Sequence, residues 1–141
     1  MVKKLLNLIN KLNYNLSKGK DLKNLKFLLK EYNGNEWENF IDLTNNDNYS
    51  KSLIYRNNIF DMHVISWKSN QESKIHDHPN NGCLMKILEG QIREENYSFT
   101  KMPLGNTLIF DNFKNLKQGD IAYQEGNINL HKIKNNTDKD T

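Results

Sequence analysis

The amino-acid sequence predicts a mainly β fold, a small sandwich or barrel with α-helices at its N-terminal end. Leucines recur at helical spacing in the first third of the chain, whereas short β-like runs separated by Gly, Asn, Asp and Pro follow from about Leu53. The 141 residues suffice for one hydrophobic core and are too few for two. We therefore expect one domain over residues 1–141, with a helical part at 1–45 and a β-barrel at 50–135.

Two amphipathic helices are expected at the N-terminal end. Their apolar positions, spaced three and four residues apart, are Leu5, Leu8, Ile9 and Leu12 in the first helix and Leu22, Leu25, Leu28 and Leu29 in the second. Asp21 is the expected N-cap of the second helix, and Gly34 is its expected end. Asn35 is expected to cap a short third helix that carries Trp37. The apolar stripes of these helices are expected to belong to the core.

The rest of the chain is expected to form short strands. The predicted strands are residues 53–56, 60–67, 82–88, 91–97, 108–110, 121–124 and 130–134. Glu89 with Gly90 predicts a tight turn between two of these strands, and Gly119 with Asp120 predicts another before Ile121. Strands at this spacing are typical of a small sandwich or barrel.

The composition excludes several classes of function. The net charge is only +3, and the lysines alternate with acidic residues rather than forming a basic stripe, so nucleic-acid binding is not expected. The single cysteine, Cys83, excludes an internal disulfide and favours a reducing compartment, the cytoplasm. Asn7, Asn10 and Lys11 interrupt the N-terminal apolar run, so neither a signal peptide nor a membrane span is expected.

The spacing of the histidines predicts a metal site. His76 and His78 are two residues apart, so in an extended segment both imidazoles point to one face and can converge on one ion. His131 from a distant strand completes a set of three neutral nitrogen ligands. A metal held by three neutral ligands keeps its positive charge and has open positions, which favours a thiolate as a further donor. The same three ligands also hold Ni, Zn or Cu. His63 has no partner in this spacing and is expected to be structural or at the surface.

Two segments of the sequence resemble the cupin motifs. Residues 76–90 resemble the first motif, with Cys83 at the position where most cupins carry a ligand Glu, and residues 119–135 resemble the second, with Glu125 in place of the usual proline. A narrower resemblance, to cysteine dioxygenase type I, runs over nearly the whole chain. The residues that carry it are 55–57, 65–67, 75–78, Cys83, Met85, Lys86, Gly90, Leu130 and His131.

This resemblance implies a cupin barrel that holds Fe(II) on His76, His78 and His131 and oxidises free L-cysteine with O2 to cysteine sulfinic acid. In the family an arginine pairs with the substrate carboxylate, and the matching residue here is Arg56. A guanidinium meets a carboxylate with two parallel hydrogen bonds, which a lysine does not reproduce. The expected partners are the thiol substrate and O2, and the chain is expected to be a monomer or a weak dimer.

Cys83 is the other candidate site residue that the resemblance implies. In the animal enzymes the matching cysteine can form a thioether with a tyrosine well after the third histidine, and this sequence ends at Thr141 without a tyrosine there. The sequence therefore resembles the family without its C-terminal part. We expect no crosslink, and we expect Cys83 to be a free thiol near the metal or a small buried residue.

Two other functions are open at this point. One is a non-catalytic cupin that binds metal but does not enclose cysteine and oxygen. The other is a dioxygenase for another small thiol carboxylate, such as 3-mercaptopropionate. Arg56 favours a substrate with a carboxylate over cysteamine, which has none.

Overall fold

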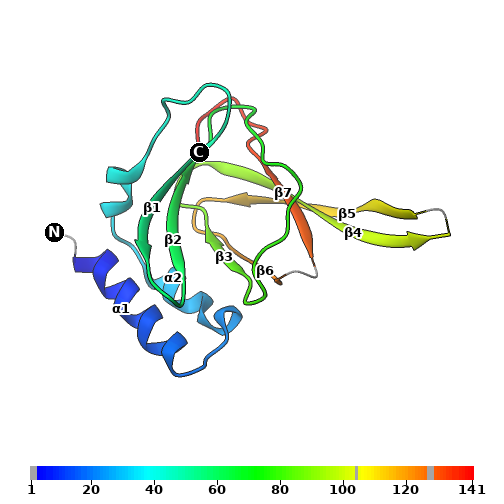
Figure 1. Cartoon of the computed structure of the whole chain (residues 1–141). Helices are drawn as coiled ribbons and strands as arrows, with labels where there is room; N and C mark the ends of the chain where they lie inside the picture. Colours follow the sequence, from blue (N-terminus) through cyan, green and yellow to red (C-terminus); the bar gives the residue numbers. More distant parts are fainter. Residues whose placement is uncertain (1–2, 104, 127–128) are drawn as a thin grey trace.

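The computed structural model describes residues 3–103, 105–126 and 129–141. Its elements, in chain order, are the helix α1 (Lys3–Ser17), the 3-10 helix η1 (Leu22–Leu25), the helix α2 (Lys26–Glu31), the 3-10 helix η2 (Glu36–Phe40) and the strands β1 (Ser50–Arg56), β2 (Asp61–Ser66), β3 (Cys83–Lys86), β4 (Gln91–Met102), β5 (Gly105–Lys117), β6 (Ile121–Gln124) and β7 (Leu130–Lys134). The helices lie next to β1 and β2, whereas β4 and β5 form a long hairpin that extends away from them (Figure 1). The fold is mainly β with N-terminal helices, as the sequence predicts.

The described strands form three antiparallel sheets. β1 pairs with β2, β3 pairs with β6, and β4 lies between β5 and β7. An isolated bridge between His76 and His131 joins the segment before β3 to β7. The arrangement is consistent with a jelly roll, but over the described residues the sheets do not close into the expected barrel.

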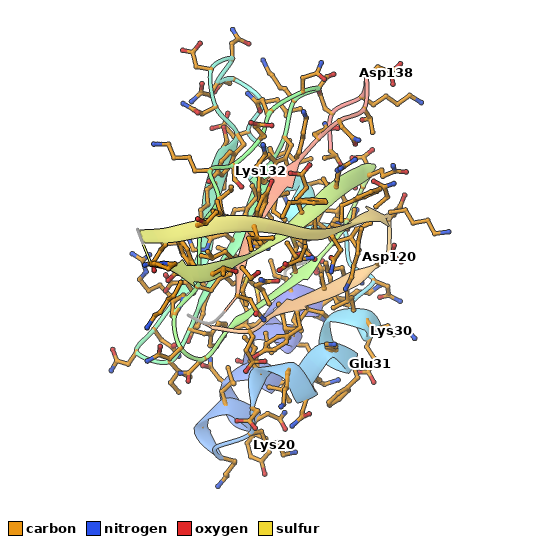
Figure 2. All side chains as sticks on the ribbon, turned by 90° about the vertical axis from the view of Figure 1, so that its right-hand side faces the viewer. Lys20, Lys30, Glu31, Asp120, Lys132 and Asp138 are labelled. Atoms are coloured by element: carbon orange, nitrogen blue, oxygen red, sulfur yellow. The ribbon has the colours of Figure 1, made fainter. Side chains whose placement is uncertain are left out.

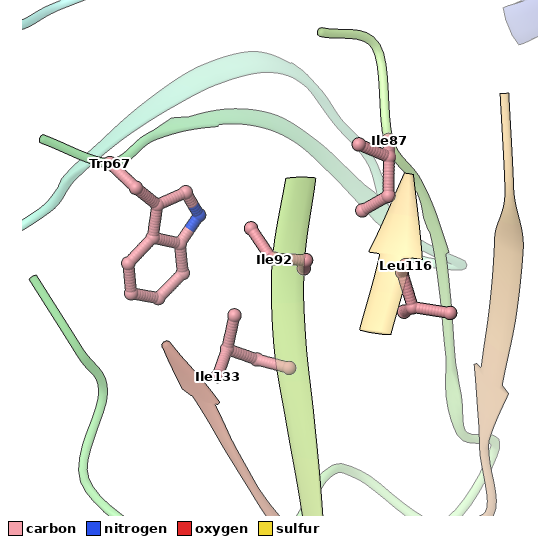
Figure 3. Packing of buried hydrophobic residues seen from close by; sticks show 5 residues of the cluster. All are labelled: Trp67, Ile87, Ile92, Leu116 and Ile133. Atoms are coloured by element: carbon pink, nitrogen blue, oxygen red, sulfur yellow. The ribbon is translucent and has the colours of Figure 1, made fainter. Parts of the chain in front are cut away.

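One hydrophobic cluster holds the sheets together. Trp67 follows β2, Ile87 follows β3, and Ile92, Leu116 and Ile133 come from β4, β5 and β7. The five side chains form one packed cluster and lie near one another in Figure 3. Each is at most 8% exposed, and burying a large aliphatic side chain stabilises a fold by about 1.5–3 kcal/mol. This cluster therefore joins the sheet of β4, β5 and β7 to the ends of β2 and β3.

A second cluster docks the helices on the strands. Its buried members are Leu8, Leu12, Leu25 and Leu28, so the helical stripes belong to the core as predicted. Met62 of β2 and Leu84 of β3 pack against it. Lys86 Nζ also donates hydrogen bonds to the carbonyls of Leu29 and Tyr32, at 2.8 and 2.5 Å, which hold the end of α2 on β3. No helix in the described part of the chain is long and apolar enough to cross a membrane.

Charged side chains of both signs lie at both ends of the molecule. Lys20, Lys30 and Glu31 project from the helical end, and Lys132 and Asp138 lie toward the opposite end (Figure 2). This mixture agrees with the small net charge of +3.

Several boundaries differ from those predicted. The second helix is divided into η1 and α2 and ends at Glu31, before Gly34. Asp21 precedes η1 and Asn35 precedes η2, but neither side chain makes a capping hydrogen bond. β6 and β7 have the predicted bounds, whereas β5 has 13 residues instead of the three at 108–110. Nearly every residue of β5 is exposed. A strand without a buried face needs no alternation of apolar and polar residues, and this alternation is what identifies strands in a sequence.

Candidate metal centre

Three histidines converge where the segment before β3 meets β7. His131 lies in β7, and His76 faces it in the isolated bridge, with backbone hydrogen bonds of 2.9 and 3.0 Å in the two directions. His78 follows two residues after His76. The Nε2 atoms of His76 and His131 are 3.0 Å apart, and those of His78 and His131 are 2.6 Å apart. The structure thus brings together the three ligands predicted from the sequence, with their ligand atoms all within 4.8 Å of one another.

Hydrogen bonds at Nδ1 orient two of these rings. His131 Nδ1 lies 3.0 Å from a carboxylate oxygen of Glu94, and His76 Nδ1 lies 2.8 Å from the carbonyl oxygen of Lys74. Both oxygens are acceptors, so each Nδ1 donates a proton, and in the neutral form of each ring Nε2 carries a lone pair. In that form the two lone pairs face each other across 3.0 Å, and either a shared proton or a metal ion between them removes the repulsion. The donor set therefore fits a metal ion.

The separation of 3.0 Å between the Nε2 atoms of His76 and His131 also fits two ligands of one ion, whereas the 2.6 Å between those of His78 and His131 is shorter than such ligands require. Metal–nitrogen distances of about 2.1 Å at right angles place two ligand nitrogens about 3 Å apart. A metal held by these three imidazoles would keep open positions for substrate, as non-haem Fe(II) sites with three protein ligands do. Because imidazole also suits Zn, Cu and Ni, the ligands select a class of metals rather than one metal.

Burial keeps two of these histidines neutral. Removal from water, followed by the charges of His131, His76 and Lys51, lowers the pKa of His78 to about 4. The pKa of His76 is lowered first by burial and then by the charges of His131 and Lys51, against the opposing hydrogen bond to the Lys74 carbonyl. Neutral imidazole is the form that binds metal, so both rings are ready to act as ligands near neutral pH.

Glu94 of β4 is a site residue that sequence reasoning missed. Its side chain is 3% exposed, and it hydrogen-bonds to His131 Nδ1. A carboxylate behind a ligand histidine fixes the orientation and tautomer of the ring and raises the basicity of the other nitrogen. The strand period holds the signal that would have found it, because Glu94 shares the inner face of β4 with the buried Ile92. An acidic residue on an apolar strand face is rarely buried without a partner.

A large cavity lies against the three histidines. Its volume is about 910 Å³, within the range of small-molecule sites. Besides the histidines, its wall includes Cys83 and, from the β1–β2 pair, Lys51, His63 and Ile65. His63, which was expected to be structural or at the surface, is half-buried on this wall.

Cys83 and Arg56 take different positions relative to the cavity. Cys83, a free cysteine at the start of β3, lines the cavity, and burial raises the pKa of its thiol, so the thiol keeps its proton near neutral pH. Arg56, at the end of β1, is not among the described residues that line the cavity. Its guanidinium donates two hydrogen bonds, of 2.9 and 2.8 Å, to the carboxylate of Asp61. The structure therefore brings Cys83, but not Arg56, to the three histidines.

The sequence matches the family model of cysteine dioxygenase type I over residues 2–141. Cysteine dioxygenase type 1 of Homo sapiens is 27% identical over 88 residues, which are 62% of this chain and 44% of that protein. Cysteine dioxygenase type 1 of Danio rerio is 25% identical over 111 residues, which are 77% of this chain and 55% of that protein. The chain thus spans about half the length of these relatives.

Among solved structures, the Drosophila melanogaster CENP-C cupin domain is similar with a TM-score of 0.44 and 13% sequence identity, over 74% of this chain and 84% of that chain. A likeness at this level says nothing about function. The family match, in contrast, covers nearly the whole sequence, and the structure independently brings together the three histidines predicted as ligands. The chain belongs to the cysteine dioxygenase type I family.

Proposed function

We propose that this protein is a non-haem iron thiol dioxygenase that oxidises L-cysteine with O2 to cysteine sulfinic acid, with His76, His78 and His131 as the ligands of Fe(II). The observation that carries the proposal is the convergence of three imidazoles, whose ligand nitrogens all lie within 4.8 Å of one another. Membership of the family supports the reaction and the substrate. In the reaction both atoms of O2 are added to the sulfur of the thiol.

His76, His78 and His131 would hold Fe(II), which would then offer open positions to the thiolate of the substrate and to dioxygen. The neutral histidines leave the positive charge of the site uncompensated, which favours an anionic thiolate over a neutral donor. Glu94 holds the His131 ring in one orientation through Nδ1. Cys83 lies on the cavity wall as a protonated thiol, so it does not compete with the thiolate of the substrate for the metal.

The role of Arg56, the partners and the location of the protein are further parts of the proposal. The carboxylate-binding role of Arg56 stays a prediction, because it requires the guanidinium to leave Asp61 and turn toward the cavity. The proposed partners are a small thiol and O2, and a monomer or weak dimer stays the predicted state. The proposed location is a reducing compartment, the cytoplasm, because Cys83 is a free thiol beside the site.

Turnover tests the proposal. The protein is loaded with Fe(II) without oxygen and is then given L-cysteine and air, while oxygen uptake is recorded and cysteine sulfinic acid is identified by mass spectrometry. We expect product from the wild type and none from His78→Ala, because that variant keeps only two of the ligands. Bound iron without oxygen uptake or sulfinate would instead favour a non-catalytic metal-binding cupin. A sulfinate formed from 3-mercaptopropionate but not from cysteine would reassign the substrate.

A further inference from the structure

A second cavity, here called the apolar cavity, is lined by residues of η2, of the segment after it, and of β2, β3 and β4. Its volume is about 140 Å³. Its apolar wall includes both tryptophans of the chain and several aliphatic residues, among them Trp37, Leu43, Val64, Trp67, Ile87 and Ile92. A protein cavity of about 150 Å³ with an apolar lining stays free of water and binds benzene or xenon. The size and the lining of the apolar cavity therefore suit a small apolar molecule.

The polar side chains of this wall are engaged in hydrogen bonds within the protein. Ser66 Oγ accepts a hydrogen bond of 3.1 Å from the backbone N–H of Asp42. Lys86 Nζ donates to two carbonyls at the end of α2, and Thr141 Oγ1 donates to the carbonyl of Glu89. A water molecule enclosed in a protein needs about two to four polar partners. The wall therefore favours an apolar occupant over water.

The apolar cavity shares part of its wall with the cavity that contains the three histidines, here called the histidine cavity. Ile65, Trp67 and Met85 line both. Ile65 lies on β2 and Met85 on β3, and these strands belong to different sheets, so side chains rather than a backbone ladder separate the two cavities at this point. Methionine is unbranched and has three rotatable bonds, so its side chain adapts easily. A small molecule can therefore cross this wall when Met85 changes its rotamer.

Of the two reactants of the proposed thiol dioxygenase, O2 is the apolar one. Cysteine carries an ammonium and a carboxylate near neutral pH, and an apolar wall disfavours both charges. Transfer of O2 from water into an apolar space is favourable. Resting on the proposed function, we propose that the apolar cavity takes up O2 and passes it between Ile65 and Met85 to the histidine cavity. The thiol and O2 then reach the three histidines from different sides.

Xenon, an inert apolar atom, tests the binding without turnover. The metal-free protein is placed under xenon, and its methyl resonances are recorded by NMR. We expect saturable shifts for the methyl groups of Leu43, Val64 and Ile87, which line the apolar cavity. Leu8 of α1 is just as buried but belongs to the other cluster, and its methyl groups should not shift.

Leu43→Trp is expected to fill the apolar cavity and to abolish the xenon shifts of Val64 and Ile87. Leu108→Trp is the matched control and should bind xenon as the wild type does. Leu108 lies on β5, is 40% exposed, and is not among the described residues that line either cavity. Circular dichroism shows whether each variant is folded.

Competition between xenon and O2 connects the apolar cavity with the reaction. In the Fe(II)-loaded wild type, xenon at about twice its dissociation constant should raise KM for O2 about threefold and leave kcat and KM for L-cysteine unchanged. This arm needs no variant, so it decides even if Leu43→Trp does not fold. A folded Leu43→Trp should have a raised KM for O2 that xenon does not raise further.

The proposal is overturned if xenon shifts no methyl group of the apolar cavity, or if xenon bound there leaves KM for O2 unchanged. Sulfinate formation is scored separately from xenon binding. Saturable xenon binding in a protein that forms no sulfinate would contradict the dioxygenase function, and with it the delivery of O2, but would leave the apolar cavity as a site for small apolar molecules.

Discussion

The buried carboxylate of Glu94 accepts a hydrogen bond from His131 Nδ1 and so orients the His131 ring in the candidate metal centre. Both side chains are at most 4% exposed, so their hydrogen bond is shielded from water and is strengthened by the low dielectric around it. Because Nδ1 is committed to Glu94, only Nε2 of His131 is left for an ion. A buried carboxylate that lost this partner would strongly destabilise the fold, so folding and site geometry depend on the same contact.

Glu94→Gln is expected to weaken metal binding by about tenfold to a hundredfold, because the amide keeps the shape of the side chain and loses the charge that polarises the ring. The measurement is competition for Co(II) against a chelator of known affinity. Glu95→Gln is the matched control, since Glu95 is the next residue of β4 and contacts Arg93 and Tyr97 instead. Equal Co(II) affinities of Glu94→Gln and the wild type would contradict the orienting role.

The convergence of the three histidines could be predicted from the sequence, whereas the partner that orients His131 could not. The spacing of His76 and His78 alone determines that their side chains share a face. Glu94 acquires its role only when β4 pairs with β7, because it then lies opposite Ile133 and diagonally from His131. The strand period marks Glu94 as an acid on the inner face of β4, but only the pairing of distant strands identifies His131 as its partner.

At the scale of elements, the start of α1 is capped by a residue of another helix. Glu36 of η2 accepts hydrogen bonds from the backbone N–H groups of Lys4 and Leu5, at 3.0 and 3.4 Å. Its other carboxylate oxygen accepts a hydrogen bond of 3.0 Å from the hydroxyl of Tyr32. A carboxylate at a helix N-terminus satisfies free N–H groups and complements the helix dipole. Glu36 therefore fastens α1 to the end of α2.

Glu36→Ala is expected to lower the melting temperature by a few degrees, on the order of the effect of losing a helix cap. The measurement is thermal unfolding followed by circular dichroism. Glu38→Ala in the same helix is the control, because no hydrogen bond or ion pair of the Glu38 side chain is found in the described part of the chain, and it should melt as the wild type does. If the two variants melted at the same temperature, Glu36 would not be the cap of α1.

The contact with Glu36 also predicts a pH dependence. Burial, and then the hydrogen bond to Glu36, raises the pKa of Tyr32 from 10.0 to about 12. Between these values the folded state holds a proton that the unfolded state has lost, so the free energy of unfolding falls as the pH rises through this window. Denaturant unfolding at about pH 9 and about pH 11 should show a larger loss for the wild type than for Tyr32→Phe. Equal losses would assign the pH dependence to other groups.

The sequence predicted the bounds of helices and strands that bury apolar side chains. It did not predict the bounds of a strand whose side chains are exposed. The stripe of α1 and the bounds of β6 and β7 follow from apolar residues that reach the core. The β4–β5 hairpin, in contrast, leaves Phe99, Ile109 and Phe110 exposed, and backbone pairing rather than a buried face defines it. The sequence pattern therefore predicts β5 as far shorter than it is.

At the scale of the whole molecule, stability depends on the cluster between the sheets. Ile92→Ala is expected to lower the free energy of unfolding by about 2–5 kcal/mol, because it opens a cavity beside a side chain only 2% exposed. Ile109→Ala, at a position 41% exposed on β5, is the control and should change it by less than about 0.5 kcal/mol. Denaturant unfolding measures both, and a similar loss in the two variants would contradict the assignment of the core.

The metal site links distant parts of the chain into one folded unit. Two of its ligands precede β3 and the third lies in β7, and the His76–His131 bridge joins them. A metal that binds only this folded arrangement stabilises it. The spacing of short β-like runs predicted the fold class, and the spacing of the histidines predicted the three candidate ligands. The open arrangement of the sheets could not be predicted, because it depends on which strands pair.

X-ray absorption at the iron edge of the Fe(II)-loaded protein, recorded without oxygen before and after addition of L-cysteine, tests the central claim most directly. The account predicts three imidazole nitrogens around the iron, and a sulfur neighbour that appears when cysteine is added. His131→Ala should lose one imidazole from the spectrum. Iron bound mainly by oxygen ligands, or a spectrum that cysteine leaves unchanged, would contradict a three-histidine centre that binds the thiol.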